Sequence, residues 1–63
     1  MTYAELREVL DFTQLFDGAT VDRILATCGK ATLGHAIVAC EVLHLGLCGN
    51  DIDEMMIACE EVS

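Results

Sequence analysis

A stretch of twenty residues, Ala31 to Asn50, limits the possible folds of this chain more than any other feature, because it carries one formal charge, Glu41. Wound as an α-helix at about 100° per residue, it directs apolar side chains nearly all the way round its axis. That pattern is typical of a helix buried on most sides. We therefore expect a central, buried helix over about residues 32–45, wrapped by the rest of the chain.

The residues before this stretch carry the signals of two further helices. Thr2 and Glu5 form a Thr-x-x-Glu capping box, which predicts a helix over about residues 2–16. An Asp-Gly pair then favours a turn, since glycine tolerates the left-handed conformation that closes many helices. Thr20 is placed to cap a short second helix over about residues 20–28.

A fourth helix is predicted after the apolar stretch, over about residues 51–62, with Asn50 or Asp51 as its cap. Its predicted inward stripe consists of Ile52, Met55, Met56, Cys59 and Val62. The chain has no proline and no β-type alternation, so no strand is expected. The fold class predicted is all-α: residues 1–63 form a single helical domain, a compact bundle of four helices with the third central and buried.

The composition indicates that the chain associates with itself or with a partner. A domain of 63 residues has a marginal core of its own, yet 54% of the residues are hydrophobic. So much apolar surface on so small a chain is expected to be covered by a second copy or another protein. A homo-oligomer is therefore predicted.

The net charge of −8, from eleven acidic and three basic residues, narrows the class of partner. Arg7, Arg23 and Lys30 are too few and too scattered to neutralise phosphates, so nucleic acids and anionic membranes are not expected to bind. A basic surface on a larger protein is the electrostatically favoured partner. The alternative, that acidity only keeps an apolar chain soluble, stays open.

Two aliphatic side chains fall alone on otherwise polar helical faces, Leu15 on the first helix and Ile57 on the last. Single apolar anchors inside a charged rim are typical of protein interfaces. The predicted partner-binding residues are Leu15, Asp53, Glu54, Ile57, Glu60 and Glu61.

Compartment and chemistry follow from what the sequence lacks. The first residues have no basic and apolar signal pattern, and Glu41 interrupts the only stretch long enough to cross a bilayer, so a cytoplasmic protein is expected. There its four cysteines should remain thiols. No catalytic residues and no cofactor are predicted, because the chain shows neither a nucleophile with a base nor a phosphate loop.

Cys40, His44 and Cys48 recur at every fourth residue and would share a face of an unbroken helix. Structural zinc sites usually show paired Cys-x-x-Cys spacings, which are absent, so core cysteines are favoured and no metal ligands are predicted. The function expected is a small acidic interaction module, regulatory or inhibitory, of the kind encoded by bacteria or their phages. A structural homo-oligomer is the alternative, and a Cys/His metal-binding domain is the third.

Overall fold

The computed structural model describes residues 1–62 of the chain. This part contains four α-helices and no strand. They are α1 (Tyr3–Thr13), α2 (Gly18–Thr27), α3 (Leu33–Val42) and α4 (Gly49–Val62). Their radius of gyration is 10.1 Å, close to the value of about 10.6 Å expected for a compact domain of this length. The predicted all-α class is confirmed.

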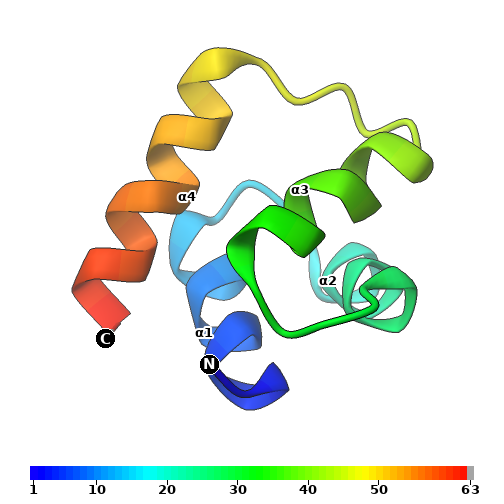
Figure 1. The fold of residues 1–63 in the computed structure, drawn as a ribbon. Helices are drawn as coiled ribbons and strands as arrows, with labels where there is room; N and C mark the ends of the chain where they lie inside the picture. The colour runs from blue at the N-terminus through cyan, green and yellow to red at the C-terminus, as the bar shows by residue number, and fades with distance from the viewer. Residues whose placement is uncertain (63) are drawn as a thin grey trace.

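Each helix packs against two others. α4 runs alongside α1 in the opposite direction, and the connection between α3 and α4 arches over one end of the molecule (Figure 1). α2 also packs on α1, and α3 packs on α2 and α4. The four helices therefore form a closed ring of contacts. The most extensive of these contacts is between α1 and α4 and does not involve α3.

The core is built mainly from large side chains of α1, α2 and α4, together with small side chains of α3. It consists of Leu6, Val9, Leu10, Val21, Ile24, Cys28, Ala36, Ala39, Cys40, Met55 and Ala58. Burial of the apolar area of these side chains is the main favourable term in folding. α1 buries Leu6, Val9 and Leu10, and α2 buries Val21 and Ile24, in agreement with their i, i+3, i+4 spacing.

The predicted burial of the third helix on most sides is not confirmed, nor is its central position. α3 buries a narrow face of small residues, Ala36, Ala39 and Cys40. Val38 and Val42 on the opposite side are 57% and 60% exposed. Three short neighbouring helices do not surround a fourth in so small a domain, since too little chain is available to cover it.

The start of the first helix was predicted correctly and its end was not. The Thr2 hydroxyl accepts a hydrogen bond from the Glu5 N–H at 3.1 Å, and the Glu5 carboxylate accepts one from the Thr2 N–H at 3.0 Å. α1 ends at Thr13 rather than near residue 16, because Gln14 adopts the left-handed conformation with φ of 57°. Residues 15 and 16 therefore lie in a loop.

The remaining helix ends also differ from the prediction. Asp17, rather than Thr20, caps α2, accepting a hydrogen bond from the Thr20 N–H at 2.7 Å. α3 ends at Val42, three residues early, before His44 takes a left-handed φ of 56°. α4 begins at Gly49, so Asn50 and Asp51 lie in its first turn instead of capping it.

Candidate functional site

The solvent-facing side of α4 is the first candidate site. Met55 and Ala58 are the buried residues of this helix, and they fix which side of it faces the core. The opposite side, here called the α4 outer face, consists of Asp53, Glu54, Met56, Ile57, Glu60 and Glu61, all exposed. The structure therefore places every predicted partner-binding residue of the last helix on one exposed surface.

The negative charges at the C-terminal end of the α4 outer face are not explained by helix stability. Glu60 and Glu61 lie in the last turn of α4, where the helix dipole favours cations, and no basic residue is present there. α4 as a whole contains no lysine or arginine. Its outer face is therefore uniformly negative, with two of its carboxylates at the less favourable end of the helix.

Met56 is the residue of this face that the sequence prediction missed. It was assigned to the inward stripe, but it is 54% exposed, beside Ile57 at 51%. Ala58 is buried in its place. The assignment was wrong because adjacent residues on a helix point about 100° apart, so Met55 and Met56 cannot both face a narrow contact. The exposed pair gives the acidic face an apolar centre.

Leu15 does not belong to the α4 outer face. It was predicted to be an apolar residue without an internal contact on the first helix, but it lies in the loop after α1, half-buried and packed against the core. The Thr13 hydroxyl accepts a hydrogen bond from its N–H at 3.3 Å. The premature end of α1 is what moves this side chain from a polar helical face into the interior.

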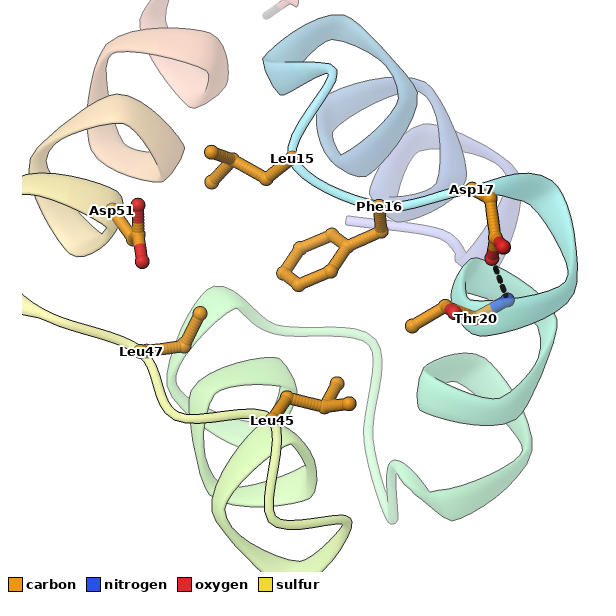
Figure 2. A pocket seen from close by; sticks show the side chains of 7 residues that line it. All are labelled: Leu15, Phe16, Asp17, Thr20, Leu45, Leu47 and Asp51. Carbon is orange, nitrogen blue, oxygen red and sulfur yellow. Dashed lines mark hydrogen bonds between the residues drawn. The ribbon is translucent and has the colours of Figure 1, made fainter.

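A hollow of about 420 Å³ at one end of the bundle is the second candidate site. The connection between α1 and α2, the connection between α3 and α4, and the first turns of α2 and α4 surround it (Figure 2). Its lining residues are Leu15, Phe16, Asp17, Thr20, Leu45, Leu47 and Asp51. Phe16 and Leu47 extend toward the middle of the hollow from opposite sides, Leu15 points toward the side of α4 and Leu45 toward the side of Thr20, and the two aspartates lie at opposite edges (Figure 2).

Both aspartates of the hollow are tied to helix starts. Hydrogen bonds from the side chain and backbone of Thr20 hold the pKa of Asp17 below its ordinary value, so its carboxylate is ionised at neutral pH. Asp51 accepts a hydrogen bond from the Cys48 N–H at 3.2 Å across the first turn of α4. These contacts fix the position of both negative charges.

Cys40, His44 and Cys48 do not share one helical face in the structure, as an unbroken helix would require. α3 ends before His44, and Cys40 is buried whereas His44 and Cys48 are exposed. Within residues 1–62, no three His, Cys, Asp or Glu side chains are grouped to hold a metal ion. Burial raises the pKa of the Cys28 and Cys40 thiols, which disfavours the reactive thiolate form.

No protein-family model, curated protein or solved structure matches this chain, so its function has to be inferred from its own residues. Among the described residues, no helix combines the length and apolar character needed to cross a bilayer.

Proposed function

We propose that this chain is a small acidic interaction module, regulatory or inhibitory, that docks the α4 outer face on a basic surface of a larger protein. The setting proposed is the cytoplasm of a bacterium, with the chain encoded by the host or by a phage. Its net charge of −8 favours encounter with a positive surface through long-range attraction.

The observation that carries this proposal is the exposed pair Met56 and Ile57 within a ring of carboxylates. Methionine is enriched at interface cores, and a flexible thioether adapts to an uneven partner surface. A central apolar contact surrounded by charges provides most of the binding energy in many interfaces, while the charged rim sets the partner and the association rate.

The dimensions of the molecule suit one such interface. The accessible surface of the chain is 3817 Å². A standard interface uses about 800 Å² on each partner, which is about a fifth of this surface.

Affinity capture with matched variants tests the proposal. The tagged chain is incubated with bacterial lysate at about 0.05 M and 0.5 M salt, concentrations that differ strongly in electrostatic screening. We expect a basic protein to be retained at low salt, released at high salt, and lost with Ile57→Asp. Val42→Asp is the matched control, because it adds the same charge to an exposed position on α3. Equal capture by wild type and Ile57→Asp would contradict the proposal.

A structural homo-oligomer remains the alternative, and a specific observation favours it. Val38 and Val42 lie one turn apart on α3, both more than half exposed, and offer an apolar ridge to a second copy. In this case Val42→Asp would reduce the sedimenting mass to that of one chain, 6.8 kDa, whereas Ile57→Asp would leave the mass unchanged. The two variants therefore separate the two functions.

A further inference from the structure

We propose that the hollow between the two connections is a second docking site, which binds a partner segment presenting an aromatic or aliphatic side chain next to an arginine or lysine. This site is separate from the α4 outer face. Binding at the hollow can therefore be tested separately from the function proposed for that face.

The inner surface of the hollow combines apolar side chains with polar groups. Leu15, Phe16, Leu45 and Leu47 are each half-buried, packed against the core on one side and left uncovered on the other. A volume of about 420 Å³ lies within the range of roughly 300–1,000 Å³ that is usual for ligand pockets. An apolar group that enters the hollow would cover part of the exposed surface of these side chains, which is favourable in proportion to the area buried.

The charge at the edge of the hollow identifies the kind of occupant. Asp17 and Asp51 both accept hydrogen bonds at their own helix starts. Arg7 forms an ion pair with Asp22, on α1 and α2, and in the part of the chain that the structure describes no basic side chain pairs with either edge carboxylate. An apolar group that carries a cation complements both the wall and the edge.

Other occupants fit these observations less well. Helix starts attract anions, but those of α2 and α4 already hold the carboxylates of Asp17 and Asp51. A purely apolar ligand would bring its surface next to two carboxylates and gain nothing from them. A basic protein segment satisfies both parts of the site and agrees with the net charge of the chain.

The hollow is also largely formed in advance. The Thr13 hydroxyl donates to the Leu10 carbonyl at 2.7 Å and accepts from the Leu15 N–H, which holds the first connection against α1. The Asp51 contact to the Cys48 N–H holds the end of the second connection against α4. A preformed site loses less conformational entropy on binding.

Peptide probes titrated into the ¹⁵N-labelled chain test the inference. The probe is N-acetyl-Phe-Arg-amide, and its controls are N-acetyl-Phe-Glu-amide and N-acetyl-Gly-Arg-amide. We expect saturable NMR shifts at the amides of Phe16, Thr20 and Leu47 with the first probe, and about fivefold weaker binding by the Phe-Glu control, which lacks the cation. The Gly-Arg control should also bind more weakly, because it lacks the apolar side chain. Absence of saturation at millimolar Phe-Arg probe, or equal binding of the Phe-Glu probe, would overturn the inference.

Charge variants locate the effect at the hollow. Asp17→Asn with Asp51→Asn removes both edge charges but keeps an oxygen acceptor at each helix start. Asp11→Asn with Asp53→Asn is the matched control, which changes the net charge equally, from −8 to −6, at exposed positions outside the hollow. We expect the first pair to weaken the Phe-Arg probe about fivefold and the control pair less than twofold. Equal weakening by both pairs would show that the net charge of the chain, and not the two edge carboxylates, determines binding of the probe. That result would contradict the site.

Two further variants keep the result interpretable. Leu47→Ala shortens the wall in an irregular connection, and it should weaken every probe that contains Phe even if the double Asn variant folds poorly. Binding of the Phe probes unchanged by Leu47→Ala would contradict the site. Ile57→Asp should leave the titration as in wild type, because that residue lies on the α4 outer face. Failure of capture through α4 and failure of peptide binding in the hollow are therefore distinguishable.

Discussion

Met55 and Met56 provide the sharpest test of how α4 is placed. They are neighbours in sequence with the same side chain, yet Met55 is 0% exposed and Met56 is 54% exposed. Met55→Ala and Met56→Ala therefore remove the same atoms from the core and from the surface of one helix. Both substitutions keep or improve helix propensity, so propensity does not account for a loss.

The structure predicts a large difference between the two variants. Removal of a buried methionine side chain costs about 2–5 kcal/mol in the free energy of unfolding. A chain of 63 residues has a total stability of about 3–9 kcal/mol. Met55→Ala should therefore lose about a fifth or more of the total, and its Tm should fall by at least about 8 °C. Met56→Ala should change the stability by no more than about 0.5 kcal/mol.

Thermal and urea unfolding followed by circular dichroism measures both variants. The measurements are repeated over a range of protein concentrations, so that a contribution from self-association is visible as a shift in the midpoint. If Met56→Ala lost as much stability as Met55→Ala at every concentration, α4 would bury both methionines within one chain. The α4 outer face as defined here would then be wrong.

Three further predictions concern pH, thiols and association. The pKa of Asp17 is lowered by folding, so its contribution to stability is complete above about pH 4 and is lost as the pH falls further; acid unfolding of Asp17→Asn, followed by circular dichroism, should show a shallower loss over this window. Chelator and reductant should leave the helical circular dichroism unchanged, and a large loss of helix with the chelator or the reductant would contradict this. A thiol reagent should modify exposed Cys48 before buried Cys28 and Cys40. Sedimentation at micromolar concentration should give at least twice the chain mass of 6.8 kDa, and a monomer at high concentration would refute self-association.

Local signals in the sequence were enough to predict the helix class and several contacts. The capping box of Thr2 and Glu5 depends on two residues three apart, and both of its hydrogen bonds are present. Val21, Ile24 and Cys28 repeat at helical spacing and are buried. Such features depend on neighbours along the chain, so they can be predicted without knowledge of the tertiary structure.

Helix ends were harder to predict because they depend on contacts distant in sequence. Gln14 and His44 take left-handed conformations, which cost more free energy for them than for glycine. Glycines lie close by in the sequence, Gly18 and Gly46, and a local pattern would place the helix ends there. After Gln14, the side chains of Leu15 and Phe16 pack against the core, which offsets the cost of this conformation. No local pattern indicates that this packing outweighs a continued helix.

The candidate sites depend on which faces the other helices leave uncovered. α3 is apolar on nearly all sides, and the sequence alone does not show that neighbours cover only the side of Ala36 and Cys40. The hollow could not be predicted either, since it brings Leu15 and Phe16 together with Leu45 and Leu47, about thirty positions away in the chain. The exposure of Ile57 could be predicted, because its whole helical face is polar except for Met56.

The rate of association with the captured partner, measured by stopped flow across a range of salt concentrations, tests the docking of the α4 outer face most directly. Glu61→Lys and Glu41→Lys change the net charge equally, one on this face and one at an exposed position of α3. Docking through the α4 outer face predicts that Glu61→Lys slows association and weakens its dependence on salt concentration. Glu41→Lys should have a much smaller effect on both. Equal effects of the two variants, or a wild-type rate independent of salt, would contradict it.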